Sequence, residues 1–121
     1  GKQEHNMAIS YNWDVNTVDT YPTLDSNADV IYNVHWRITG TDDANNDADG
    51  NAITGFIYGT QSLDTTDISS FIAFASVNAT TVQGWVESTM GEEEVQSLKD
   101  NLDANIAGQI TPTVVTKTLV A

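Results

Sequence analysis

From Val30 to Thr39 every second side chain is apolar, and this alternation limits most strongly how the chain can fold. Side chains on a β-strand point alternately to its two faces, so the pattern predicts a strand with one buried face. The apolar positions are Val30, Tyr32, Val34, Trp36 and Ile38. The other face is mostly polar and carries Asn33, His35 and Arg37, which indicates a sheet with a core on one side.

Two further strands are predicted beside this one. Alternation over residues 9–15 indicates a first strand. We expect it to continue past a bulge and to end near Tyr21, because Pro22 lacks a backbone donor. Residues 52–61 are rich in β-branched and aromatic side chains and predict a third strand. It forms a hairpin with the second strand across a long loop, residues 40–51.

Two helices are predicted in the second half of the chain. The first begins after the N-cap residue Asn78 and ends at Gly91. The second opens with glutamates at 92–94, whose carboxylates oppose the positive end of the helix dipole, and we expect Gly108 and Pro112 to stop it. The apolar stripes consist of Val82, Trp85, Val86 and Met90 in the first helix and Val95, Leu98, Leu102 and Ile106 in the second.

The remaining segments complete the predicted fold. Residues 62–77 mix turn residues with apolar ones and predict an irregular connection, and residues 113–120 have the β-branched composition of a final strand. The predicted class is α+β, an antiparallel sheet of about four strands (β-β-β-α-α-β) with a C-terminal helical pair packed on one face. We expect a single domain over residues 7–121, preceded at 1–6 by a disordered lead-in or a cloning remnant.

The charge of the chain narrows the range of partners. Four basic residues stand against seventeen acidic ones, which gives a formal net charge of -13. Such a field repels phosphate backbones and anionic lipids, so we expect neither nucleic acid nor membrane as a partner. The absence of cysteine excludes disulfides, thiolate zinc sites and cysteine nucleophiles.

The predicted loop is acidic and has features of a calcium site. Oxygen-bearing side chains recur at every second position, the spacing with which a tight loop wraps a hard cation. With Gly50 as the turn glycine, Asn45, Asp47 and Asp49 occupy the first, third and fifth positions of a calcium loop, but Phe56 replaces the glutamate expected at the twelfth. Calcium is the one candidate cofactor. The alternative is a solvated hairpin tip, which prefers the same residues.

Other chemically interesting residues have simpler explanations. His35 and Arg37 share a polar strand face where a catalytic pair can sit, but cross-strand packing or charge pairing accounts for both. His5 belongs to the lead-in, and the glutamates at 92–94 are explained by the helix terminus. No nucleophile, base and orienting group occur at an interpretable spacing, so we expect no catalytic residues and no enzymatic activity.

A series of short motifs between Met7 and Leu119 carries a family resemblance. The motifs are Tyr11 and Trp13, Asp19 to Pro22, Ala28-Asp29-Val30, Val34-His35-Trp36-Arg37, Thr39-Gly40, Tyr58-Gly59-Thr60, Gly84-Trp85-Val86, Met90-Gly91-Glu92-Glu93 and Pro112-Thr113-Val114-Val115-Thr116. Together they resemble small uncharacterised proteins encoded by tailed phages, especially phages of marine cyanobacteria. That family has no established catalytic residues, so no site residue is implied.

The resemblance implies a biological setting for the chain. It suggests a phage structural or accessory protein, located in the virion or in the cytoplasm of the infected bacterial host. Such a protein acts through contact with a protein partner or through self-association. The acidic segment 42–49 is longer than in the relatives, which makes it a local elaboration. The alternative function is a calcium-dependent binding module that uses the loop 42–51.

Overall fold

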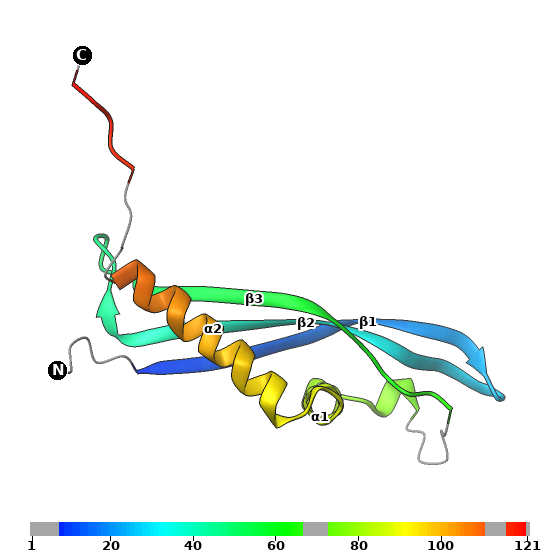
Figure 1. The fold of residues 1–121 in the computed structure, drawn as a ribbon. Helices are drawn as coiled ribbons and strands as arrows, with labels where there is room; N and C mark the ends of the chain where they lie inside the picture. The colour runs from blue at the N-terminus through cyan, green and yellow to red at the C-terminus, as the bar shows by residue number, and fades with distance from the viewer. Residues whose placement is uncertain (1–7, 67–72, 111–115, 121) are drawn as a thin grey trace.

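A computed structural model of the chain describes residues 8–66, 73–110 and 116–120. The elements are β1 (Ile9–Leu24), β2 (Asn27–Asn46), β3 (Ala52–Ser62), the short 3₁₀ helix η1 (Phe74–Ser76), α1 (Ala79–Met90) and α2 (Glu92–Ile110). The strands form one antiparallel sheet in the order β1-β2-β3, and the helices lie on one of its faces (Figure 1). This confirms the predicted α+β fold with a helical pair on one side of the sheet.

A tight turn at Asp25 and Ser26 joins β1 to β2. Both residues have positive φ angles, 49° and 68°, as in the type I′ turn whose twist matches that of the two strands. β1 continues to Leu24, so the prediction that it ends near Tyr21 was wrong. Proline is tolerated on an edge strand such as β1, because no described strand on its other side requires the missing N–H group. The predicted bulge is confirmed by a register shift between Asp14 and Thr17.

The second hairpin has a shorter tip than predicted. β2 runs through Gly40 to Asn46, so only residues 47–51 form the tip of the predicted loop 40–51. A register shift between Asp42 and Asn46 accommodates the extra residues of β2. The tip closes on itself, since the Asp47 N–H donates to the Asn51 carbonyl at 2.8 Å.

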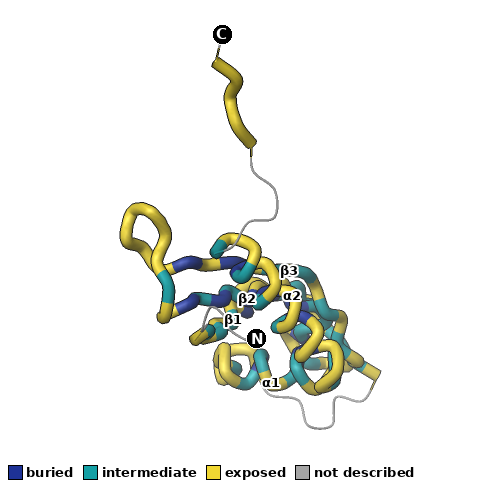
Figure 2. The backbone as a smooth tube through the Cα atoms, turned by 60° about the vertical axis from the view of Figure 1, so that its left-hand side comes forward, coloured by how far each residue is buried: buried dark blue, intermediate teal, exposed yellow. Residues whose placement is uncertain are grey.

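The core lies between the sheet and the helices, on the face that the alternation predicted. Dark blue buried segments in Figure 2 mark it on the strands where they run beside the helices. The buried side chains include Val15 of β1, Val34, Trp36 and Ile38 of β2, Val82 and Val86 of α1, and Val95, Leu98, Leu102 and Ile106 of α2. Both predicted apolar helix stripes therefore contribute to the core.

The helix boundaries agree with the predicted caps at three of four ends. The Asn78 side chain accepts a hydrogen bond from the Thr81 N–H at 2.9 Å, and Gly91 ends α1 with a φ of 90°. The acidic first turn of α2 is also as predicted. The helix does not stop at Gly108 but continues to Ile110, because Gln109 anchors the last turn by donating to the Thr54 carbonyl at 2.8 Å. The predicted stop at Pro112 lies outside the described residues.

Two glycines set the distance between α2 and the sheet. Gly40 of β2 and Gly55 of β3 lie directly opposite each other beneath the helix. A Cβ atom on Gly40 would lie 3.3 Å from Cδ1 of Ile106, and one on Gly55 would lie 2.6 Å from Oδ1 of Asn105. A side chain at either position would therefore press on α2, and the contact would be tightest at Gly55.

The predicted fourth strand is absent from the described part of the sheet. Residues 113–115 lie outside the described residues, and residues 116–120 form no strand and are all exposed (Figure 2). A β-branched composition favours a strand only where a partner edge is available, and these residues point away from the sheet (Figure 1). In the connection 62–77, Phe71 and Ile72 also lie outside the described residues, and η1 is the regular element of its described part.

Candidate functional site

The sheet has a second face that the helices do not cover. We call it the open face, and its positions in β2 and β3 are His35, Arg37, Thr39, Thr54, Phe56, Tyr58 and Thr60. Two aromatic side chains on this face are unusually exposed, Phe56 at 58% and Tyr58 at 69%. An exposed pair of aromatic rings on an otherwise polar strand marks a candidate interaction surface.

Arg37 completes this surface, and we call Arg37, Phe56 and Tyr58 the Arg37 patch. Arg37 lies directly opposite Tyr58 in the strand register. Its guanidinium carbon is 4.8 Å from the centroid of the Phe56 ring and 6.0 Å from that of the Tyr58 ring. The rings themselves are stacked with centroids 6.2 Å apart. Stacking of this kind fixes the orientation of the guanidinium group.

The charge of Arg37 has no acidic partner in the described part of the chain. No carboxylate oxygen there lies within 4.0 Å of its guanidinium nitrogens. Asp14 is its neighbour across the β1–β2 register, but the Asp14 carboxylate accepts the Asn16 N–H at 3.0 Å in the bulge. In a chain with seventeen acidic residues, an arginine that is stacked on exposed rings and has no hydrogen-bond acceptor among the described residues is available to a ligand or partner.

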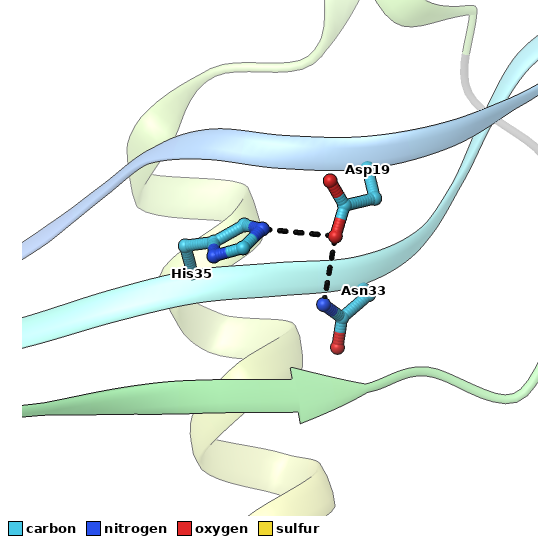
Figure 3. A network of polar contacts seen from close by, with 3 residues as sticks. All are labelled: Asp19, Asn33 and His35. Atoms are coloured by element: carbon cyan, nitrogen blue, oxygen red, sulfur yellow. Dashed lines mark hydrogen bonds and ion pairs between the residues drawn. The ribbon is translucent and has the colours of Figure 1, made fainter.

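Asp19 joins His35 and Asn33 on the same face of the sheet (Figure 3). Its Oδ2 atom accepts a hydrogen bond from Asn33 Nδ2 at 2.8 Å and lies 2.9 Å from His35 Nε2. The bond from Asn33, followed by the one to His35, holds the pKa of the Asp19 carboxyl below its usual value. The predicted pairing of His35 with a charge is thus present, but with a carboxylate that the sequence did not single out.

The geometry at His35 is that of an oriented base without a nucleophile. The Asp19 carboxylate orients the imidazole ring in the way that a catalytic base is oriented. No hydroxyl of the described residues is hydrogen-bonded to the ring. His35 and Arg37, predicted to share one face, do so, but the two side chains make no contact that joins them into one site.

Asp42 is a buried carboxylate that no sequence pattern singled out. It is fully buried, and its oxygens accept hydrogen bonds from the Ala8 N–H (3.2 Å), the Ala44 N–H (2.8 Å) and Asn45 Nδ2 (2.9 Å). Burial raises the pKa of the Asp42 carboxyl, but these hydrogen bonds outweigh burial and hold the pKa below its usual value. The residue joins the start of β1 to the end of β2, so its role is structural.

Of the predicted calcium ligands, Asp47 and Asp49 lie at the tip of the second hairpin and Asn45 lies at the end of β2. Oδ1 of Asp47 accepts the N–H groups of Asp49 and Asn51, both at 2.9 Å, and Asn45 donates its amide to Asp42. The described residues contain no group of three or more His, Cys, Asp or Glu side chains that could hold a metal ion. Calcium binding by Asn45, Asp47 and Asp49 stays a prediction.

A cavity of about 300 Å³ lies between this tip and the end of α2. It is lined by Asn45, Asn46, Asp47, Ala48, Ile53, Gln109 and Ile110. Its volume is at the lower end for small-molecule sites, and its polar groups belong mostly to the predicted calcium loop. The sequence alone did not indicate it, because Gln109 and the tip are brought together only by the fold.

Comparison with known protein families places the chain in one of them. Residues 8–119 match the family described as a domain of unknown function (DUF7936). The chain belongs to this family. No curated protein and no solved structure matches the chain. Membership of DUF7936 agrees with the resemblance to uncharacterised proteins, whereas the phage origin stays a prediction.

The DUF7936 match has two consequences for the candidate sites. It includes β1, β2 and β3 and therefore the whole Arg37 patch. It also reaches residue 119, so the exposed segment after α2 is part of the family domain. Within the described residues, no helix is long and apolar enough to cross a membrane.

Proposed function

We propose that this chain is a phage-encoded structural or accessory protein without enzymatic activity, which acts through protein–protein contacts in the virion or in the infected cell. Its contact surface is the open face of the sheet. The observation that carries the proposal is Arg37 stacked on the exposed rings of Phe56 and Tyr58 without a carboxylate partner.

The composition of the Arg37 patch supports contact with another protein. Arginine, tyrosine and other aromatic residues dominate the energetically important positions of protein interfaces. The two rings offer a rigid apolar surface, and the guanidinium group held beside them can bind a carboxylate with two parallel hydrogen bonds. A partner that brings a carboxylate onto Arg37 and an apolar side chain onto Tyr58 satisfies both groups together.

The non-enzymatic part of the proposal is supported by the surroundings of His35. A hydrolytic site needs a nucleophile beside its base and donors for a developing negative charge. The described hydrogen bonds of His35 and Asp19 connect them only to each other and to Asn33. The trio therefore orders the strand surface around the patch.

The charge of the chain favours a partner that brings basic side chains to the contact. A net charge of -13 attracts positively charged surfaces over distances of about the Debye length. The same charge disfavours nucleic acid and anionic lipid as partners.

Site-specific photo-cross-linking tests this proposal. A photoreactive phenylalanine analogue replaces Tyr58 on the open face, and in a matched control it replaces Gln96, an exposed residue on α2. We expect defined covalent adducts with a protein from position 58 in the infected cell, and their loss when Arg37→Ala is added. Absence of adducts from position 58, or equal adducts from both positions, would contradict the proposal.

Calcium-dependent binding is the second candidate function. The favouring observation is the cavity of about 300 Å³, to which Asn45 and Asp47 of the predicted calcium loop both contribute. In this function the metal binds at the tip and completes a surface for a further ligand. A rise in thermal stability on addition of calcium, absent from the Asp47→Ala, Asp49→Ala variant, distinguishes it from the first candidate.

A further inference from the structure

β3 has a free edge on the side away from β2. It is the last strand in the order β1-β2-β3, and no described strand pairs with its outer side. In Figure 1 it forms the outer border of the sheet. An edge of this kind carries unpaired N–H and C=O groups and can accept another strand.

Two hydrogen bonds show which residues of β3 point outward. The Leu63 N–H donates to the Tyr32 carbonyl of β2 at 2.9 Å, and the Thr54 carbonyl accepts from the side chain of Gln109 at 2.8 Å. Backbone groups of an antiparallel strand alternate between its two neighbours. The backbone N–H and C=O groups of the odd-numbered residues therefore point toward β2. Those of the even-numbered residues, including Phe56, point outward.

The free part of this edge has defined limits. At one end Gln109 occupies the Thr54 carbonyl, and at the other the Gln61 side chain donates to the Ser62 carbonyl at 2.9 Å. Between them, the outward backbone groups of Phe56, Tyr58 and Thr60 have no hydrogen-bond partner among the described residues. This is the length of edge that a short strand covers.

Residues 116–120 have the properties of such a strand. Their sequence, Thr-Lys-Thr-Leu-Val, is of the composition found in strands, and yet Leu119 is 93% and Val120 97% exposed. The segment projects away from its own sheet (Figure 1) and lies within the DUF7936 match up to residue 119. An exposed apolar strand sequence and an unpaired strand edge are thus present in the same domain.

We propose that residues 116–120 of one copy add as a strand to the β3 edge of a second copy, and that reciprocal exchange closes a dimer. The inference rests on the proposed function, since it names one partner, a second copy of this chain. Side chains of an added strand alternate, so Lys117 and Leu119 share one face. With that face on the side of Phe56 and Tyr58, Leu119 covers the exposed rings and Lys117 brings positive charge to an acidic domain.

The test uses two proline variants that each remove one half of the contact. In an antiparallel added strand with Lys117 and Leu119 beside the rings, the backbone groups of these two residues face β3 and those of Thr118 face away. Lys117→Pro therefore removes an N–H group that pairs with β3, and Lys117→Arg is its control. Thr60→Pro removes an outward N–H of β3 and leaves the bonds to β2 in place, since proline is tolerated on edge strands. Circular dichroism verifies that both variants fold, and light scattering measures their mass.

The expected result is a wild-type dimer of twice the 13.1 kDa chain mass that Lys117→Arg retains. Each proline variant alone is a monomer. A mixture of the two forms a heterodimer, because the intact segment of one reaches the intact edge of the other. Hydrogen exchange at the Phe56, Tyr58 and Thr60 amides is slow in the wild type and fast in Lys117→Pro.

Three outcomes overturn the inference. The first is a monomeric wild type with fast exchange at these amides. The second is a monomer with slow exchange, which means pairing within one chain. The third is a dimer that survives Lys117→Pro. None of them decides the proposed function, because adducts from position 58 with a different protein can still form. Loss of those adducts together with a monomeric wild type means that both proposals fail.

Discussion

The hydroxyl of Tyr11 on β1 donates a 2.5 Å hydrogen bond to the carboxylate of Asp103 on α2. The amine of Lys99, one turn earlier on the helix, lies 5.1 Å from the centroid of the Tyr11 ring. These contacts tie an edge strand to a helix that otherwise packs on β2 and β3. Loss of the hydroxyl should therefore weaken the packing of α2 against β1.

We expect Tyr11→Phe to lower the free energy of unfolding by about 1 kcal/mol, because the ring and its packing remain while a hydrogen bond to a charged acceptor is lost. Burial, then the hydrogen bond and the charge of Asp103, raise the pKa of Tyr11 to about 12. The folded state therefore holds this proton more tightly than the unfolded chain. The contribution is complete below the ordinary tyrosine pKa of 10.0 and is lost as the pH rises through 12. Urea unfolding of the wild type and Tyr11→Phe at pH 8 and at high pH measures how much stability the substitution costs at each pH. The control Tyr58→Phe should show no such loss.

The glycine at position 55 can be tested by adding a side chain beneath α2. We expect Gly55→Val to lower the free energy of unfolding by about 2 kcal/mol, since the Cβ atom alone would lie 2.6 Å from Asn105 Oδ1. Asn105 is in turn bonded to Gln109, so its side chain cannot move without cost. Thr54→Val, one residue earlier on the open face, is the control and should change stability by less than about 0.5 kcal/mol. Equal effects of the two variants would mean that α2 does not rest on Gly55.

A substitution that raises the free energy of unfolding is expected at Gly84 in α1. Apart from the adjacent residues and the helix's own backbone, no atom of the described residues lies within 4 Å of the position that its Cβ would occupy, and the residue is in the interior of the helix. Alanine has a higher helix propensity than glycine, so Gly84→Ala should raise the free energy of unfolding by about 1 kcal/mol. Thermal unfolding measures this as an increase in Tm, and a decrease would show that α1 needs a flexible backbone here.

Local patterns predicted the core well, because each depends on residues close together in the sequence. The alternation around Val34 and Trp36 identified the buried face of β2, and the spacing of Leu98 and Leu102 identified the buried face of α2. The N-cap at Asn78 was predicted for the same reason. These features need no knowledge of how the strands are paired.

The candidate site depends on strand register, which local patterns do not contain. The polar face of His35 and Arg37 was predicted, but their neighbours on that face were not. The position of Asp19 beside His35 depends on the register of the first hairpin, and that of Tyr58 opposite Arg37 depends on the register of the second. A shift of one residue in either hairpin would place other side chains there. The prediction of a final strand failed for a related reason. Strand propensity does not specify which sheet edge, or which copy of the chain, supplies the pairing partner.

Asp42 should be sensitive to a substitution that keeps its shape. Asp42→Asn replaces an acceptor oxygen with a donor that faces an N–H group, so we expect a loss of about 2 kcal/mol in the free energy of unfolding. Asp43→Asn, at the exposed neighbouring position, is the control. Unfolding in urea at pH 7 measures both, and a neutral Asp42→Asn would show that the carboxylate is not required at the start of β1.

The Asp42 carboxylate also makes the stability of the fold depend on pH in the acidic range. Its folded-state pKa lies below the ordinary value of 3.8, so the native state releases this proton more readily than the unfolded chain. Its contribution to stability is present above pH 3.8 and is lost as the pH falls toward the folded-state pKa. Stability curves from pH 6 to pH 2 should therefore be shallower for Asp42→Asn than for Asp43→Asn.

The calcium loop provides the last prediction. We expect the wild-type Tm to be the same in calcium and in chelator, because Oδ1 of Asp47 already accepts two backbone N–H groups that hold the tip without a metal. Asp47→Ala removes both bonds and should lower Tm slightly in either buffer, while Asp49→Ala should not. A calcium-dependent rise in the wild type that both variants abolish would instead favour the second candidate function, since a ligand raises Tm only by binding the folded state. Magnesium at the same concentration separates binding at a calcium site from general screening of the acidic surface.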